Sequence, residues 1–385
     1  MQQRNNLIKK IIILLLAIIF AVSGCTSRNG EKPVIELWVS GSDNVRLIFE
    51  KLIDEFNKDS EYNHTGTVKL KYYLPWLRTQ AARERMLMAY RSGQRSAGID
   101  LLEFSEWELS VYIQEAGENM FHNIETAKIP NLKNLRIPPP SNGRFVIPFR
   151  GTTVVMAYNS DYVPSPPATS AEVAEWIKAN PGRFAYNTPD TGGAGASFVL
   201  TKLYNPLPEE AIVSLDEKWV AQWTQGWDYL KDIHPYLYRN RGRVVYPHRN
   251  QGSLDLLASG DIWMTPAWAD QTIMGIKTGA LPASIKFYQL DYPFTGSLQY
   301  MGIPIFGSNS DIAHAFINFL LSQKAQNILL KEMAAVPLIH LDMLDPREVV
   351  YVGGLDVNAF RSVRIGALQA EMYKIWNNTI GSIRD

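Results

Sequence analysis

Cysteine and histidine are scarce in this sequence, and their scarcity argues against two common ways of stabilising a fold. The 385 residues include one cysteine, Cys25, so no disulfide can form within a single chain. The six histidines form no His-Glu-x-x-His motif and show no regular metal-ligand spacing. We therefore expect a fold that depends on its hydrophobic core, with no metal ion and no cofactor.

An excess of charge of either sign is also missing. Lys and Arg total 38 and Asp and Glu total 38, and no basic run or basic–aromatic stripe appears. Beyond the N-terminal region, no stretch approaches the 18 apolar residues of a membrane-spanning helix. A Gly-x-Ser-x-Gly nucleophile motif is absent as well. These absences argue against a nucleic-acid partner, a polytopic membrane protein and a serine hydrolase.

The N-terminal region has the organisation of an export signal. Arg4, Lys9 and Lys10 precede the apolar run 11–22, which has about the length of a signal-peptide hydrophobic region and is short for a membrane span. The run ends in VSGC (22–25), which resembles the lipobox of bacterial lipoproteins.

This resemblance implies cleavage before Cys25 and acylation of that residue. Residues 1–24 would then be the signal peptide, and 25–32 a lipid-anchored tether. The alternative is an uncleaved N-terminal anchor helix with an incidental cysteine. We expect a protein anchored by lipid at the outer face of the plasma membrane or on the periplasmic side.

Strand-like and helix-like segments alternate after the tether. Segments 34–39, 68–73 and 99–104 are typical of strands, and a 3.6-residue apolar period predicts helices over 43–56 and 79–92. This alternation predicts an α/β domain with a largely parallel sheet. Ligands of such sheets bind at the carboxyl ends of the strands.

A second α/β run occupies roughly residues 152–295. Thr169 and Glu172 have the spacing of a capping box, and the helix that they begin should end at 180–182. A short strand at 184–186 and a helix from Ser197 are expected next.

Four stretches in sequence order resemble the family 1 extracellular solute-binding proteins of bacterial ABC importers. The first looks like that family's crossing between lobes, and the last looks like its return segment. The stretches are GRFVIPFRGTTVVMAYNSDYV (143–163), SAEVAEWIKANPGRFAY (170–186), LLASGDIWMTPAW (256–268) and MGIPIFGSNSDIAHAFINFLLSQKAQ (301–326).

The resemblance implies a two-lobed periplasmic-binding-protein-like α/β fold. Each lobe would be a sheet flanked by helices, and a hinge of two or three crossings would join them. We expect lobe 1 over 33–148, lobe 2 over 149–300, and a return segment over 301–385 that packs mainly on lobe 1.

A glycine-rich loop in the second half is one candidate ligand contact. Thr191, Gly192 and Gly193 precede the helix expected from Ser197. Exposed N–H groups at a helix N-terminus favour an anionic or acceptor-rich ligand. The alternative is a strand-to-helix turn that needs glycine for its backbone, and Asp190 would oppose an anion.

Residues after the predicted strands of the first lobe are further candidates. Trp38, Ser42 and Asp43 follow the first strand, and an indole there could stack on a sugar or attract a cation. Trp38 could equally belong to the core, and helix capping is the favoured role for Asp43. Glu103 and Trp107 follow the third strand, and each could likewise be a ligand contact or a structural residue.

The hinge and the WMTPAWAD stretch supply the remaining candidates. Arg150 and Thr152 lie at the expected hinge, where Arg150 could also be a structural ion-pair partner. Trp263, Trp268 and Asp270 place two indoles and a carboxylate within eight residues. By contrast, we expect three other tryptophans to belong to helix cores: Trp176, Trp223 and Trp227.

These observations predict a non-enzymatic, monomeric solute-binding protein that delivers a small polar solute to ABC transporter permease subunits. Carbohydrate is slightly favoured, with a polyamine, a thiamine-like cation or a phosphate-bearing solute as alternatives. A lipid-anchored hydrolase of glycosidase type is a second hypothesis, because the separation of two catalytic carboxylates depends on the fold. A sensor or adhesin without a transporter is a third.

Replacing Cys25 tests the lipid anchor. Cys25→Ser removes the thiol that would carry the lipid, so we expect either a folded soluble product or an unprocessed precursor. Metabolic labelling with a radiolabelled fatty acid and cell fractionation measure the outcome. A variant that is cleaved at the predicted site and stays membrane-bound would disprove the lipoprotein prediction.

Overall fold

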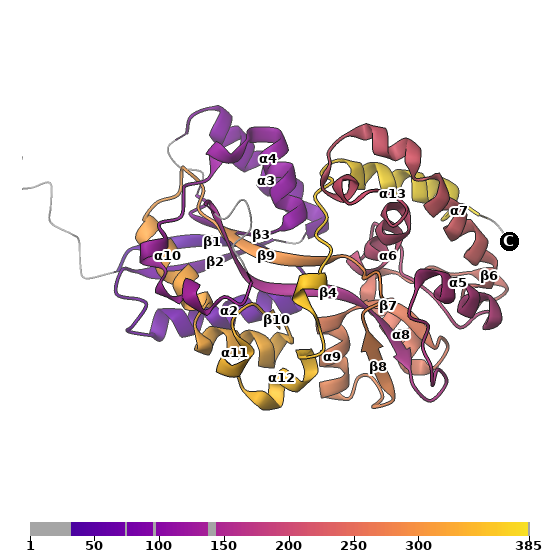
Figure 1. Ribbon diagram of the computed structural model, residues 1–385. Coiled ribbons are helices and arrows are strands. Elements are labelled where there is room, and N and C mark those ends of the chain that lie inside the picture. The colour runs from indigo at the N-terminus through magenta and orange to yellow at the C-terminus, as the bar shows by residue number, and fades with distance from the viewer. Residues whose placement is uncertain (1–31, 74, 95–97, 138–143, 384–385) are drawn as a thin grey trace, which may run out of the picture.

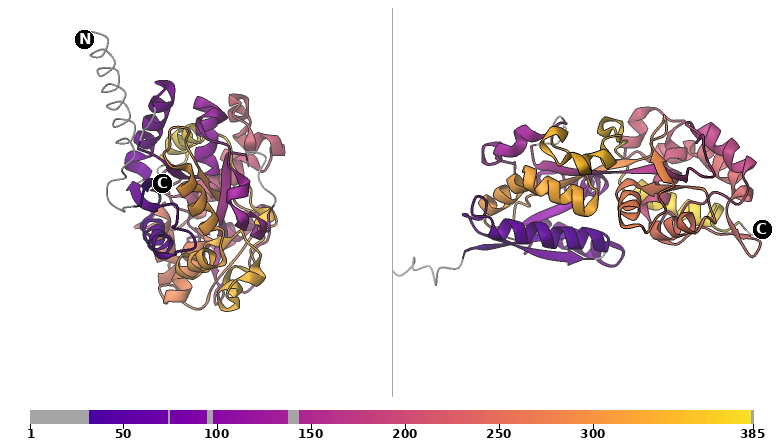
Figure 2. Two further views of the ribbon diagram at one scale, coloured as in Figure 1. Left: turned by 90° about the vertical axis from the view of Figure 1, so that its left-hand side faces the viewer. Right: turned by 90° about the horizontal axis from the view of Figure 1, so that it is seen from below.

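The computed structural model describes residues 32–73, 75–94, 98–137 and 144–383. Cys25 and the predicted signal peptide lie outside these residues, so lipid anchoring stays a prediction. Among the described residues, no helix has the length and apolar character needed to cross a membrane. The chain forms two lobes that lie side by side, with strands running from one into the other (Figures 1 and 2).

The first lobe is built on three parallel strands. β1 (Val34–Ser40) lies between β2 (Thr67–Tyr73) and β3 (Leu101–Ser105) and is parallel to both. A helix follows each strand, and the apolar face of the first helix is buried against the sheet as its 3.6-residue period predicted. The predicted parallel α/β arrangement is therefore confirmed in this lobe. The helices are α2 (Asp43–Lys58), α3 (Pro75–Arg91) and α4 (Glu106–Ala116).

The second lobe is organised around the C-terminal half of β4 (Val146–Asn159). β7 (Met264–Trp268) and β8 (Ile285–Tyr288) both pair antiparallel with this half. Thr169 and Glu172 form the predicted capping box at the first helix of the lobe. The helices are α5 (Ser170–Ala179), α6 (Gly193–Tyr204), α7 (Thr224–Ile233), α8 (Arg249–Ser259), α9 (Ala269–Thr278) and α13 (Leu368–Thr379), with a hairpin of β5 (Arg239–Asn240) and β6 (Arg243–Val244).

Three segments of the described chain cross between the lobes. β4 pairs through its N-terminal half with β9 (Gly296–Gly302), and β9 also pairs with β3 of the first lobe. The third crossing, residues 353–367, runs in yellow from α12 (Pro346–Val352) to α13 in Figure 1.

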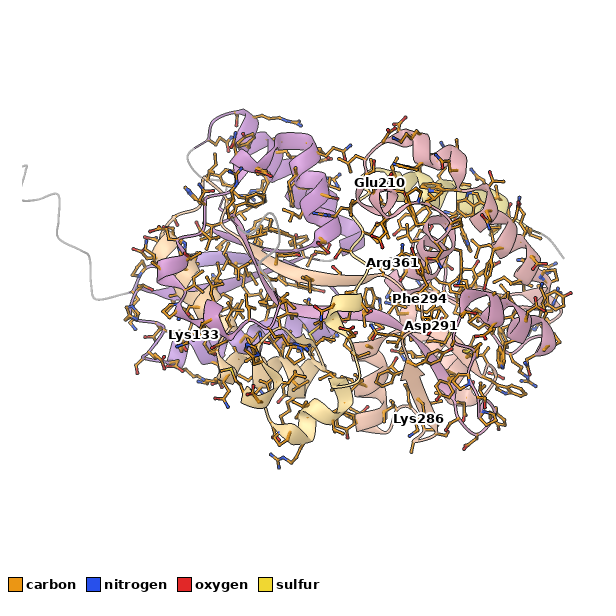
Figure 3. All side chains as sticks on the ribbon, in the orientation of Figure 1. Lys133, Glu210, Lys286, Asp291, Phe294 and Arg361 are labelled. Carbon is orange, nitrogen blue, oxygen red and sulfur yellow. The ribbon has the colours of Figure 1, made fainter. Side chains whose placement is uncertain are left out.

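Phe360 joins the third crossing to the two strands. A Cβ at Gly151 of β4 would lie 2.9 Å from the Phe360 ring, and one at Gly296 of β9 would lie 2.7 Å from it. Arg361, labelled beside Phe294 in Figure 3, stacks 4.0 Å from the ring centroid of Tyr292. Glycine is needed at both strand positions because the ring approaches the backbone so closely.

The predicted return segment divides between the lobes. α10 (Ser310–Leu320) and α11 (Gln323–Met333) pack in the core of the first lobe with β1 and α2. The last helix, α13, packs instead in the second lobe, where Trp376 donates a hydrogen bond to Tyr186 at 3.1 Å. Apolar periodicity identifies the buried face of a helix but not the lobe that covers it. The predicted boundary at 148/149 falls inside β4, which both lobes share.

Short elements complete the described chain. β10 (Val336–Pro337) pairs antiparallel with β4. The 3₁₀ helices are η1 (Glu118–Met120), η2 (Thr126–Lys128), η3 (Pro130–Asn134), η4 (Glu209–Val213), η5 (Glu217–Gln222), η6 (His234–Tyr236), η7 (Leu341–Met343) and η8 (Val357–Ala359).

The core of the second lobe contains the tryptophans predicted for it and also a lysine. Trp223 and Trp227 are buried, and Trp176 packs against the same cluster. Lys202 of α6 is 4% exposed, and its Nζ donates a hydrogen bond to Ser170 Oγ at 2.7 Å. Three aromatic rings surround this ammonium group, and no ion pair to it is found among the described residues. The rings are those of Phe198, Tyr229 and Phe294.

Lys202→Met should therefore stabilise the protein. Burial lowers the pKa of Lys202 to about 7, whereas an unfolded lysine titrates near 10.4. The cost of burying the ammonium is fully present below pH 7 and disappears as the pH rises toward 10.4. We expect a gain of ~1–3 kcal/mol at pH 6, measured by chemical unfolding, that shrinks by pH 10. The exposed variant Lys231→Met is the control, and a gain independent of pH would contradict this account.

Candidate ligand-binding site

A cavity of about 320 Å³, called the inner chamber below, lies between the lobes. The N-terminal ends of α2 and α4 contribute to it from the first lobe, and those of α6 and α9 from the second. β4 and β9 contribute residues from the crossings. The polar and charged residues that line it are Ser40, Ser42, Ser105, Glu106, Arg150, Thr152, Ser197, Asn250, Asp270, Gln271, Thr295, Ser297, Gln299 and Gln369.

The strand-to-helix turns place these side chains at the chamber. α4 begins directly after β3, and Ser105 and Glu108 form a capping box at this point. Ser105 Oγ accepts from the Glu108 N–H, and Glu108 Oε2 accepts from the Ser105 N–H at 2.9 Å. α9 begins directly after β7 in the same way. Because both strands end at the cleft, the first helical turns carry Glu106 and Asp270 to it.

A buried ion pair lies beside the inner chamber. Arg150 of β4 donates from Nη2 to Glu103 Oε1 of β3 at 3.1 Å, and the two side chains are 5% and 2% exposed. Burial raises the pKa of Glu103, and the adjacent guanidinium opposes that rise. The ion pair offsets part of the positive charge of Arg150, whose Nε has no hydrogen-bond partner among the described residues. The structural alternative for Arg150 is thus observed, although the residue also lines the chamber.

Two further carboxyl groups line the inner chamber from opposite lobes. Glu106 and Asp270 are each 8% exposed, and neither Glu106 Oε2 nor Asp270 Oδ1 has a hydrogen-bond partner among the described residues. Burial raises the pKa of both, and Arg150 and Thr152 lower that of Asp270 in part. A buried acceptor without a partner costs about 1–3 kcal/mol, and more when it is charged. A donor or cation held between the lobes would offset this cost.

The glycine loop is already occupied by protein side chains. The helix N-terminus predicted at Ser197 lies four residues earlier, at Gly193. Asn187 Oδ1 accepts from the Gly195 N–H at 2.8 Å, and Asn250 Oδ1 accepts from the Ala194 N–H at 3.1 Å. These amides satisfy first-turn donors that an anion would otherwise use.

The same contacts explain why the loop is rich in glycine. A Cβ at Gly192 would lie 2.5 Å from Asn187 Nδ2, and one at Gly195 would lie 1.8 Å from the Asn187 carbonyl oxygen. Gly193 approaches the indole of Trp268, which would lie 2.7 Å from a Cβ. The alternative role of the loop, as a strand-to-helix turn that needs glycine, therefore fits Gly192. Gly193 lines the inner chamber together with Trp268. The predicted strand at 184–186 is reduced to one bridge, Phe184 with Met264.

A second cavity of about 610 Å³, the outer chamber, adjoins the first. Asp43 and Thr191 line the outer chamber, and Ser42 lines both. The N-cap of α2 is Ser42 and not Asp43, for which capping was the favoured role, and the Ser42 side chain makes no capping hydrogen bond. The two chambers share Ser42, Asn250, Asp270, Gln271 and Met333.

Two predicted aromatic contacts lie away from both chambers. Trp38 lies within β1, two residues before the strand ends, and its Nε1 donates to the Gly98 carbonyl at 2.8 Å. This is the core role that the sequence left open. Trp263 precedes β7 and lies about 16 Å of strand length before its cleft end. It stacks on Tyr162 and Arg183 instead. The side chain of Trp107 is outside the described part.

Sequence reasoning missed most of the polar residues that line the inner chamber, among them Glu106, Asn250 and Gln271. Glu106 and Gln271 follow the ends of β3 and β7, so the rule that ligands bind at the carboxyl ends of strands could have identified them. Asn250 comes from α8 and gives no comparable local signal.

Comparison with known families identifies the class of protein. Residues 51–346 match the family model described as bacterial extracellular solute-binding protein, so the chain belongs to this family. The predicted family resemblance is confirmed at this level. It is a family of transport binding proteins and not of enzymes. Within the described ranges, no group of three or more His, Cys, Asp or Glu residues is arranged to hold a metal ion.

One curated relative and several solved structures are similar to the chain. The protein YnjB of Escherichia coli strain K12 is 32% identical over 186 residues, which is 46% of this chain and 46% of the relative, so less than half of that protein is matched. An ABC transporter structure from Clostridium perfringens has a TM-score of 0.64 at 14% identity, covering 92% of this chain and all of that one. The structure of a Streptococcus pneumoniae spermidine/putrescine ABC transporter substrate-binding protein has a TM-score of 0.61 at 14% identity. The match covers 90% of this chain and 99% of that one. These structures confirm the two-lobed periplasmic-binding-protein-like fold.

Substitutions in the glycine loop test how Trp268 is held. Gly195→Ala should lower the free energy of unfolding by about 1–3 kcal/mol, because its Cβ meets a backbone carbonyl that cannot move. Gly193→Ala should cost clearly less, because the indole of Trp268 can shift into the inner chamber. Gly354→Ala has no atom within 4 Å of its Cβ and serves as the control. Equal losses for Gly193→Ala and Gly195→Ala would show that Trp268 is fixed by packing.

Proposed function

We propose that this protein is a lipid-anchored, extracytoplasmic and monomeric solute-binding protein that captures a small organic cation between its lobes. It then delivers the cation to the permease of an ABC transporter. The observation that carries the proposal is the pair of buried carboxyl groups, Glu106 and Asp270, which line one chamber from opposite lobes, each with one oxygen that has no hydrogen-bond partner among the described residues.

The charge of the inner chamber favours a cation over an anion. Arg150 is paired with Glu103, and Glu106 and Asp270 add two acidic groups to the wall, which Arg364 and Arg150 compensate only in part. Asn187 and Asn250 occupy the first-turn N–H groups of α6 that an anion would use. A phosphate-bearing ligand would therefore meet carboxylates where it needs donors.

A neutral sugar is the second candidate. The half-buried indole of Trp268 and the amide groups of Asn250 and Gln299 could stack on and hydrogen-bond a sugar ring. A sugar would leave the two carboxylates hydrogen-bonded but uncompensated in charge. For this reason the geometry moves the preference from carbohydrate, which the sequence slightly favoured, to an organic cation.

Lobe closure provides the mechanism of capture. Glu106 belongs to the first lobe and Asp270 to the second, so a ligand reaches both only when the lobes are close. A ligand that contacts both lobes binds the closed state better and shifts the population toward it. The structural similarity to ABC transporter substrate-binding proteins supports this mechanism of capture between two lobes.

Neutralising the two carboxylates tests the proposal. Glu106→Gln and Asp270→Asn should each weaken binding of an organic cation at least tenfold, ~1.4 kcal/mol. A thermal-shift screen with putrescine, spermidine, thiamine, choline, sugars and phosphonates first finds the ligand, since a ligand at 100 times its Kd adds ~2.7 kcal/mol of stability. Calorimetry then measures the affinities. Asp228→Asn, on the exposed face of α7, is the matched control.

The pH dependence gives a second test of the same site. Because burial raises the pKa of Glu106 and Asp270, protons compete with a cation at a higher pH than at ordinary carboxyl groups. Cation affinity should fall as the pH is lowered through these raised values, and the two variants should flatten the profile. Tight binding of a sugar with no pH dependence would replace the cation hypothesis with the carbohydrate one.

A further inference from the structure

The outer chamber has the character of a binding space but no role in the site described above. Its volume of about 610 Å³ exceeds that of the inner chamber, about 320 Å³. Its walls come from both lobes, since the start of α2 and the end of α11 face α8 and α9 across it. It is therefore part of the interlobe cleft and would be narrowed by the same closure.

Acidic side chains predominate in its walls. Asp43, Asp255, Asp270 and Glu332 line the outer chamber, and Arg249 is the basic residue among its described lining. The acidic residues come from four different helices or helix starts, so their gathering is not a local sequence effect.

The basic partners of Asp43 and Glu332 lie outside the lining of the outer chamber. Asp255 Oδ1 accepts a hydrogen bond from Gln251 at 2.8 Å, which brings no charge. Asp43 lies 3.6 Å from Arg46, and Glu332 lies 2.7 Å from Lys51. Neither Arg46 nor Lys51 is among the lining residues. Exposed pairs of this kind contribute little and leave the carboxylates available to a second cation.

The junction between the chambers points to a ligand that passes through it. Asp270 lines both chambers, is 8% exposed, and has no hydrogen-bond partner for Oδ1 among the described residues. Gln271, its neighbour, also lines both and has an unpartnered Oε1. Met333, from α11, adds an apolar surface at the same junction. Apolar residues continue into the outer chamber with Leu254, Met274 and Leu281.

We propose that the ligand is an elongated aliphatic cation with at least two positive charges, and that the outer chamber binds its second charged end. One ammonium group lies between Glu106 and Asp270, the hydrocarbon chain passes Met333, and the other ammonium group reaches Asp255 and Glu332. This inference rests on the proposed function and specifies the class of cation. A compact cation with one charge would use the inner chamber alone.

Amines matched in length test this assignment. We would compare 1,4-diaminobutane, 1,5-diaminopentane and spermidine with 1-aminobutane and 1-aminopentane by calorimetry on the full mature chain. Each diamine should bind at least five times more tightly than the monoamine of equal length. The difference should shrink in high salt, because the second subsite is exposed.

Variants of the outer chamber separate the two ends. Asp255→Asn combined with Glu332→Gln should bring diamine affinity down toward the monoamine value and leave monoamine affinity unchanged. Asp270→Asn should weaken both kinds of amine, and Asp228→Asn should weaken neither.

The outcomes are distinguishable. Equal affinities for diamines and monoamines would overturn the second subsite and leave the proposed function standing. A diamine preference that survives in the double variant would overturn the assignment to the outer chamber. If the folded protein binds choline or thiamine but none of these amines, this inference fails and the proposed function stands. If it binds no organic cation, both fail.

Discussion

Strand β4 is the constraint on which the rest of the structure depends. Its 14 residues are buried along almost their whole length, and the strand pairs with β9 and β10 in its first part and with β7 and β8 in its second. A single strand shared by both lobes fixes the distance between them and leaves bending at the crossings as the available motion.

The position of β4 also decides where charge is buried. Arg150 lies midway along the strand and forms its ion pair with Glu103 of the first lobe. Removing one partner of a buried pair costs far more than an exposed pair contributes, because the other charge is left uncompensated. The Arg150–Glu103 pair thus holds the base of the cleft in place and at the same time removes positive charge from it. The acidic groups that remain available to a ligand in the inner chamber are Glu106 from the first lobe and Asp270 from the second.

Local features were predictable from the sequence because they depend on neighbours in the chain. The apolar face of α2, the capping box at Thr169 and Glu172, and the parallel arrangement of the first three strands all follow from spacing over a few residues. Asp270, a candidate ligand contact from the sequence, follows β7 and lines the inner chamber.

The remaining features depend on contacts between distant segments. Asn250 accepts a hydrogen bond from the first turn of α6 although it lies 56 residues later in the sequence. The start of this helix and the partners of its N–H groups therefore could not be predicted from neighbouring residues. The lobe that covers α13 is fixed by aromatic packing of Trp376 on Tyr186 and Tyr246, which no periodicity reveals. Trp38 and Trp263 illustrate the same limit. Whether a tryptophan near a strand end packs in the core or contacts a ligand depends on which face of the sheet its side chain lies on and on which end of the strand it is near.

The unpartnered carboxylates link stability to function in this fold. Glu106 and Asp270 are each 8% exposed, so both carry a desolvation cost. In the proposed mechanism, closing the lobes without a cation increases this cost, and the charge of the two groups opposes closure of the empty protein. A cation between them reverses the sign of this interaction. Under the proposed function, the charges that destabilise the empty closed state are therefore the ones that make closure depend on the ligand, which is the property a transport receptor needs if empty and loaded forms are to be distinguished.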